Sequence, residues 1–90
     1  MAVLWRERAT LDLEEIHTFI SADNPSAAAR VVARLRVAID TLISFPRRGR
    51  AGVFPGTLEL VVSGLPYVIV YRLGANGIEI VTIVHGARRS

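Results

Sequence analysis

The last eleven residues of the chain, IVTIVHGARRS, contain side chains that could carry out acid–base chemistry on a phosphate ester. A β-branched run ends at His85, and Arg88 and Arg89 follow within four positions. A histidine can transfer protons near neutral pH, and arginines can bind a phosphate group through parallel hydrogen bonds. The segment therefore fits either one edge of a site that cleaves RNA or a strand end followed by a basic tail.

A second group of cations lies in the middle of the chain, where the stretch RRGR supplies Arg47, Arg48 and Arg50. All 11 basic residues are arginine, and the formal net charge is +3. A positive charge on a small domain favours nucleic acid or an acidic protein as the partner, but this value does not distinguish the two. The three arginines could hold DNA phosphates or an acidic segment of a partner protein, or they could form a solvated loop.

The composition excludes several other kinds of site. The chain has no cysteine, which excludes disulfide bonds, cysteine-ligated zinc and a thiol nucleophile. Its two histidines are far apart and no paired acidic motif accompanies them, so we expect no metal site and no cofactor. The longest apolar run, LPYVIVY, is far shorter than the roughly 18–20 residues that cross a bilayer. The start also lacks the pattern of a secretion signal, and we expect a cytoplasmic protein without a membrane partner.

The elements that must position these residues follow from the periodicity of the apolar side chains. A chain of this length is expected to form one domain, 1–90, and AVLWR at its start is typical of a strand. TLDLEEIHTFISA predicts a helix capped by Thr10. A second helix is predicted to begin with Asp23 or Asn24 as the cap, followed by Pro25. Because only a few residues join them, the two helices are expected to form an antiparallel hairpin.

The second half of the chain changes to the period of strands. RRGRAGVFPG is predicted to be a loop, and TLELVVSG, PYVIVYRL and IEIVTIVH are rich in β-branched and aromatic residues. The last two runs, with GANG between them, predict a β-hairpin in which Arg72 and Glu79 form an ion pair. The predicted fold is α+β: an N-terminal strand, an antiparallel helical hairpin, and a three-stranded antiparallel run in one small sheet, with the helices on one face.

Alternation along the predicted hairpin assigns its side chains to two faces, and both faces are apolar in the middle. One face carries Val68, Val70, Arg72, Glu79, Val81, Ile83 and His85, and the other carries Tyr67, Ile69, Tyr71, Leu73, Ile78, Ile80, Thr82 and Val84. The helices cover only one face, so the other should expose an apolar patch unless a terminal segment or a loop folds over it. Exposed apolar patches often mark protein contacts. The residues expected to bind a partner there are Val68, Val70, Val81 and Ile83.

Five segments in order resemble the RelE/ParE superfamily of toxins from bacterial type II toxin–antitoxin systems. The segments are ATLDLEEIHTFI, NPSAAARVVARL, LISFPRRGR, LPYVIVYRL and IEIVTIVHGAR, and together they span nearly the whole chain. The resemblance implies a small antiparallel sheet with an N-terminal helical hairpin, which agrees with the periodicity. It also implies a cognate antitoxin, encoded in the same operon, whose C-terminal segment lays apolar residues into grooves of the toxin.

RelE-like members of this superfamily cut mRNA on the ribosome, which requires cations and proton-transfer groups at the phosphate. Matching the PYVIVY and VHGAR segments places their basic positions at Glu59, Val61 and Val68. A carboxylate repels a phosphate, and valine transfers no proton. Only Arg88 matches a basic catalytic position, and no tyrosine follows it. Some nucleases of the superfamily use a glutamate base with an arginine and a C-terminal histidine. Glu59 and His85 could take two of those parts, but the arginine position falls at Val68, so that set is incomplete as well. If the chain is a nuclease, its catalytic residues are expected to be Arg88, His85 and Glu59.

ParE-like members share the fold but poison DNA gyrase through protein contact and catalyse no reaction themselves. The apolar patch falls where the nuclease site would lie, which makes the chain closer to ParE than to RelE and favours a protein that is not an enzyme. DNA gyrase is then the expected target, and ribosome-dependent cleavage of mRNA is the alternative. The residues expected to contact the target are Arg47, Arg48, Arg50, His85, Arg88 and Arg89.

Overall fold

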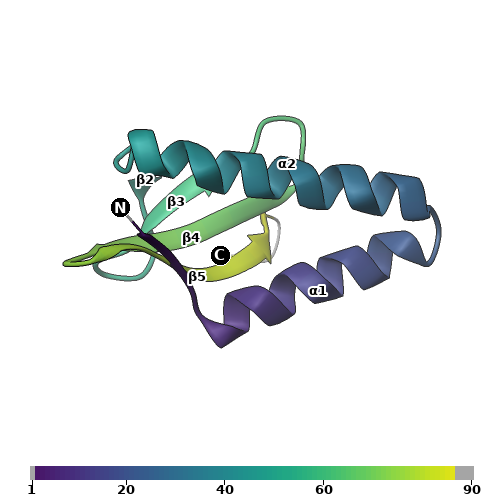
Figure 1. The fold of residues 1–90 in the computed structure, drawn as a ribbon, viewed down its shortest axis with the longest axis horizontal. Helices are drawn as coiled ribbons and strands as arrows, with labels where there is room; N and C mark the ends of the chain where they lie inside the picture. The colour runs from purple at the N-terminus through teal and green to yellow at the C-terminus, as the bar shows by residue number, and fades with distance from the viewer. Residues whose placement is uncertain (1, 87–90) are drawn as a thin grey trace.

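A five-stranded sheet and two antiparallel helices make up residues 2–86, the part of the chain that this computed structural model describes (Figure 1). The elements in chain order are β1 (Ala2–Trp5), α1 (Glu7–Ser21), α2 (Pro25–Ser44), β2 (Arg50–Ala51), β3 (Leu58–Val61), β4 (Tyr67–Gly74) and β5 (Gly77–His85). The strand order is β1-β5-β4-β3-β2, with β1 parallel to β5 and every other pair antiparallel. The predicted α+β class is confirmed. The parallel pairing of β1 and the short edge strand β2 extend the predicted three-stranded run.

The two helices begin at different kinds of signal. Asn24 caps α2, because its side chain accepts a hydrogen bond of 3.0 Å from the Ala27 N–H, and a proline follows it as predicted. The predicted cap of α1 at Thr10 is wrong, since α1 already begins at Glu7 without a side-chain cap. The Arg6 N–H bonds to the Ile80 carbonyl at 3.0 Å, so the chain passes directly from the sheet into the helix. Among residues 2–86, no helix is long and apolar enough to cross a membrane.

One core lies between the helical hairpin and one face of the sheet. Its fully buried side chains come from both layers and include Leu35 and Leu42 of α2 and Ile69, Tyr71 and Ile80 of the sheet. The predicted ion pair of Arg72 with Glu79 is confirmed near the hairpin turn, at 2.9 Å, and Arg6 joins it at 3.2 Å from Glu79. The helical hairpin is therefore fastened to the sheet mainly by apolar packing.

The assignment of side chains to faces along the hairpin is correct near the turn and wrong beyond it. Leu73 pairs with Ile78 and Tyr71 pairs with Ile80, and all four residues lie on the face predicted for them. The register then shifts between Val70 and Tyr71, so that Val70 pairs with Thr82 instead of with Val81. An extra residue in one strand places every later side chain of that strand on the opposite face of the sheet. Ile83 and His85 therefore lie on the face that the helices cover.

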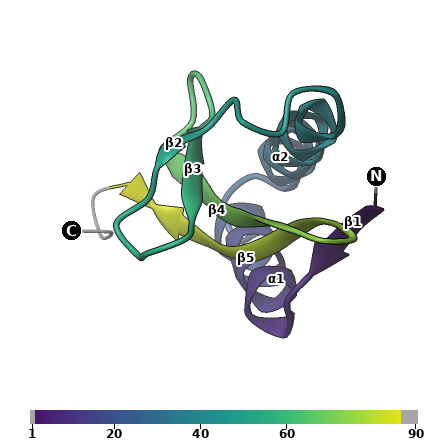
Figure 2. The same cartoon turned by 90° about the vertical axis from the view of Figure 1, so that its left-hand side faces the viewer.

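The predicted exposed apolar patch is also not present. Val68 and Val70 are 4% and 3% exposed, Ile83 is 4% exposed and belongs to the helix-side core, and Val81 is half-buried. Val70 pairs with Glu59, whose carboxylate accepts a hydrogen bond from the Val53 backbone. The segment between β2 and β3 thus reaches over the face away from the helices, and Figure 2 shows this segment passing around the sheet edge. That these four residues bind a partner remains a prediction, and the exposed patch from which it was inferred is absent.

Candidate functional site

Glu59 and His85, two of the residues that could have formed a nuclease site, lie on opposite faces of the sheet. His85, the last residue of β5, is exposed, and its ring packs edge-on against Tyr67 at 5.8 Å on the helix side of the sheet. Glu59 pairs with Val70, three positions further along β4, and so projects from the opposite face. Arg88 and Arg89 lie outside the described residues. The sheet therefore separates the glutamate from the histidine.

Glu59 holds part of the chain in place and is closed to solvent. Its side chain is 3% exposed, and one carboxylate oxygen accepts the Val53 N–H at 3.1 Å. The other oxygen lies 3.8 Å from the guanidinium of Arg50. Of the two valines at the other matched positions, Val61 is 52% exposed and Val68 is buried. The three positions offer no accessible cation for a phosphate.

The basic stretch predicted from the sequence forms an exposed loop that a buried tyrosine holds. Arg47, Arg48 and Arg50 all carry exposed side chains. The hydroxyl of Tyr71 donates a hydrogen bond to the Pro46 carbonyl at 2.8 Å and accepts one from the Gly49 N–H at 2.9 Å. A Cβ on Gly49 would lie 2.7 Å from that hydroxyl, so only glycine permits the close approach. The arginines are thus presented from a fixed backbone.

The sequence assigned Tyr71 to a strand face but not to this role. The available signal was chemical, because a buried tyrosine usually finds a hydrogen-bond partner for its hydroxyl. The partners lie 22 and 25 residues away along the chain, in a loop whose path the alternation of apolar residues does not predict.

The tyrosine makes the stability of the fold dependent on pH in the alkaline range. Burial raises the pKa of Tyr71, while the hydrogen bond from Gly49 and the charge of Arg47 oppose the shift. The unfolded chain therefore ionises this group first, and its contribution to stability, complete at lower pH, is lost as the pH rises above about 10. We expect urea denaturation to show a steeper loss between about pH 8 and 11 for the wild type than for Tyr71→Phe. Equal slopes for the two proteins would contradict this assignment.

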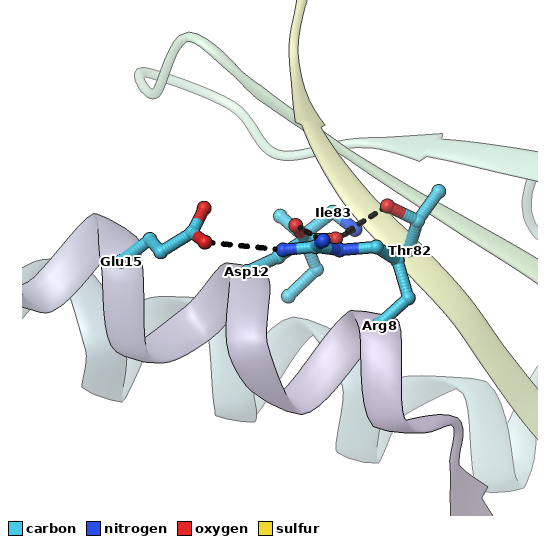
Figure 3. A network of polar contacts seen from close by, with 5 residues as sticks. All are labelled: Arg8, Asp12, Glu15, Thr82 and Ile83. Carbon is cyan, nitrogen blue, oxygen red and sulfur yellow. Dashed lines mark hydrogen bonds and ion pairs between the residues drawn. The ribbon is translucent and has the colours of Figure 1, made fainter.

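A half-open groove of about 530 Å³ runs between α1 and the end of β5, lined by Asp12, Glu15, Ile16, Phe19, Tyr67, Ile83, Val84 and His85. Its acidic side is a network of polar contacts shown in Figure 3. Asp12 accepts the Ile83 N–H at 3.0 Å and the Thr82 hydroxyl, and Arg8 lies 2.9 Å from its other oxygen. Arg8 also contacts Glu15 at 3.2 Å, and the charge of Asp12 raises the pKa of Arg8. The apolar periodicity of this helix does not distinguish Asp12 from its exposed acidic neighbours Glu14 and Glu15.

Comparisons with known proteins agree with this fold. A family model described as the ParE toxin of the type II toxin–antitoxin system, parDE, matches residues 3–90. The chain is 45% identical over 83 residues to the protein Y4kP of Sinorhizobium fredii, covering 92% of this chain and 85% of that protein. It is 41% identical over 86 residues to toxin RelE2 of Caulobacter vibrioides, covering 96% of each. A chain of the chromosomal ParDE system from P. aeruginosa has the same fold, with a TM-score of 0.86 at 23% identity over 94% of this chain and 95% of that one. The protein therefore belongs to the ParE toxin family of type II toxin–antitoxin systems.

Proposed function

We propose that this toxin acts by docking to DNA gyrase and stabilising the gyrase–DNA cleavage intermediate, without catalysing a reaction of its own. The observation that carries the proposal is the position of Glu59, which is buried, bonded to the Val53 backbone and on the opposite sheet face from His85. A general base must reach the proton that it removes, and this carboxylate faces the covering segment instead of solvent. Membership of the ParE family supports gyrase as the protein that is bound.

The family also supports a cognate antitoxin as the partner that neutralises the toxin. The chain exposes two large apolar side chains on α1, Leu11 and Phe19, and Phe19 lines the groove beside β5. Apolar side chains of an antitoxin segment would remove this surface from water. A short reading frame for a DNA-binding protein with an amphipathic tail is expected next to the toxin gene.

Cleavage of mRNA on the ribosome is the second candidate, because a relative that is 41% identical over nearly the whole chain is named toxin RelE2. In this alternative Arg88, with His85, would act on the phosphate, since Val68 is buried and has no polar group. The two candidates differ in what they damage, which makes them separable in one experiment.

The test is to express the toxin without antitoxin and to measure two products, gyrase–DNA cleavage complexes and mRNA cut on ribosomes. We expect growth arrest with DNA damage signalling and trapped cleavage complexes, and no ribosome-dependent cleavage by the purified toxin. Ribosome-dependent cleavage that Arg88→Ala abolishes would establish the second candidate instead. Growth unaffected by expression would contradict both.

A further inference from the structure

The segment of residues 45–57, called here the arginine loop, has a backbone held at several points on both sides of the sheet. On the helix side, the Tyr71 hydroxyl bonds to Pro46 and Gly49. At the sheet edge, Arg50 and Ala51 pair with β3 as strand β2. On the far side, Glu59 accepts the Val53 N–H. Figure 2 shows the chain running from α2 through β2 and around to β3.

Further bonds close the end of the arginine loop. The Gly52 N–H donates to the Thr57 carbonyl at 2.8 Å, and both the N–H and the hydroxyl of Thr57 donate to the Phe54 carbonyl, at 3.2 and 2.6 Å. Gly56 adopts a positive φ of 78°, which suits a tight turn. The loop therefore has a defined conformation although most of its side chains lie in solvent.

Two buried polar groups maintain this conformation. The Tyr71 hydroxyl belongs to a fully buried side chain, and Glu59 is 3% exposed, so both groups are withdrawn from water. Burying a hydroxyl or a carboxylate is unfavourable unless hydrogen bonds compensate, and well-packed apolar residues are often as stabilising. Both groups form hydrogen bonds with the backbone of the arginine loop. Their placement indicates that they hold this loop in its conformation.

The arginine loop presents side chains of two complementary kinds. Phe45, Val53 and Phe54 are 63%, 62% and 62% exposed. Arg47, Arg48 and Arg50 are exposed among them, and residues 45–57 contain no acidic residue. Because the backbone is already ordered, binding through these side chains costs little additional conformational entropy.

We propose that the arginine loop is the surface by which the toxin docks to the protein part of its target, on an acidic surface with an apolar recess, and that Tyr71 and Glu59 are positioning residues for it. This proposal rests on the proposed function. Arginine together with aromatic side chains is the composition typical of protein-binding hot spots. A DNA backbone would use the arginines but would leave three large apolar side chains in water, which is why a protein surface fits better.

The first test changes the charge and the apolar side chains of the loop separately. Purified Arg47→Glu/Arg48→Glu and Val53→Ser toxins are compared with the wild type for trapping cleavage complexes by the host gyrase on plasmid DNA. We expect the concentration for half-maximal trapping to rise at least about tenfold for the charge variant and several-fold for Val53→Ser, as for loss of a hot-spot contact. Matched controls are Arg30→Glu, an exposed arginine on α2, and Val37→Ser, which is also 62% exposed, and both should act like the wild type.

The second test separates positioning from stability. Tyr71→Phe keeps the buried ring and removes the hydroxyl, and we expect about fivefold weaker trapping and faster hydrogen exchange at the Gly49 amide. Ile69→Val, which removes one methyl group from the same face of the same strand, destabilises the core without touching the arginine loop. It should lower stability as much or more while trapping stays at the wild-type level. Equal losses of trapping in the two variants would show that Tyr71 acts only through stability.

The outcomes distinguish this proposal from the function on which it rests. If the wild type traps no cleavage complex, the proposed function fails. If the wild type traps complexes and the loop variants do so equally well, the docking surface is wrong. If the variants lose affinity for plain duplex DNA in parallel with trapping, with a lower salt dependence, the partner is DNA and the protein assignment is overturned. If the variants lose binding to purified antitoxin and keep trapping, the loop belongs to the antitoxin interface and the proposal is also overturned.

Discussion

Replacement of Asp12 by alanine is expected to lower the free energy of unfolding by about 3 kcal/mol, the range for losing hydrogen bonds to a charged group at a mostly buried site. The Asp12 side chain is 13% exposed and accepts bonds from the Ile83 N–H and the Thr82 hydroxyl. Both donors belong to β5, while Asp12 belongs to α1, so the carboxylate connects the first helix to the sheet (Figure 3).

The need for this connection follows from the length of β1. The pairing of β1 with β5 ends at Trp5 and Ile80, and within residues 2–86 no strand pairs with the rest of β5 on that side. The α1 helix runs along the open edge, and Asp12 supplies the acceptor that a strand would have supplied to Ile83. Alanine would leave the Ile83 N–H without its partner in a partly buried place, which costs more than the loss of an exposed contact.

Urea denaturation of the purified toxin measures the effect, and Glu14→Ala is the matched control because it removes the same charge from an exposed position of the same helix. We expect less than about 0.5 kcal/mol for the control, as for most surface substitutions. Asp12→Asn keeps one acceptor oxygen and should fall between the two. A loss for Asp12→Ala no larger than for Glu14→Ala would mean that the carboxylate does not hold α1 to the sheet.

The sequence predicts the elements of this fold well where a local signal is strong. Asn24 followed by Pro25 predicts the start of α2 because both residues act within one helical turn. Alternation and the GANG stretch predict the β4–β5 hairpin and, through it, the Arg72–Glu79 ion pair. These predictions use only residues that are close in the chain or directly opposite across a short turn.

The register shift in the hairpin could not be predicted in the same way. Val, Ile and Tyr occupy both faces of β4 and β5, so an extra residue at Val81 produces no visible break in the pattern of apolar residues. The shift moves Ile83 into the helix-side core, while Val68 and Val70 stay on the other face and are buried there, so the apolar patch on which the docking hypothesis was based is not exposed. The sequence leaves open whether Arg47, Arg48 and Arg50 contact a partner or only solvent, and the fixation of their backbone by Tyr71 and Glu59 depends on contacts between distant segments.

The parallel position of β1 depends on a single glycine that alternation also does not identify. Gly77 has a φ of 145° and pairs with Ala2 in the β1–β5 register. A Cβ added to Gly77 would lie 2.1 Å from the Ala2 carbonyl oxygen. A backbone carbonyl cannot move aside as a flexible side chain could. Only glycine therefore allows β1 to lie against β5 at this point.

Gly77→Ala is expected to lower the free energy of unfolding by roughly 3 kcal/mol, combining backbone strain of about 1–3 kcal/mol with overpacking of similar size. We expect β1 to move away from β5, which would expose Val3 and Trp5, both packed against the core. Trp5 is the only tryptophan in the chain and packs beneath the Arg36 guanidinium at 5.8 Å, so its fluorescence reports on β1 directly. A red shift in emission at low urea, before global unfolding, is the expected result.

Gly74→Ala is the control at the other end of the same turn. Gly74 pairs with Gly77, and a Cβ there would meet only the Gly77 carbonyl oxygen, at an ordinary 3.5 Å. Its φ lies outside the left-handed region, so we expect a change below about 1 kcal/mol and an unchanged Trp5 spectrum. If the free energy of unfolding falls equally in both variants, the loss arises from the turn and not from the close approach of β1. A larger loss confined to Gly77→Ala, with the shifted spectrum, would mean that β1 needs a glycine opposite Ala2 to join the sheet.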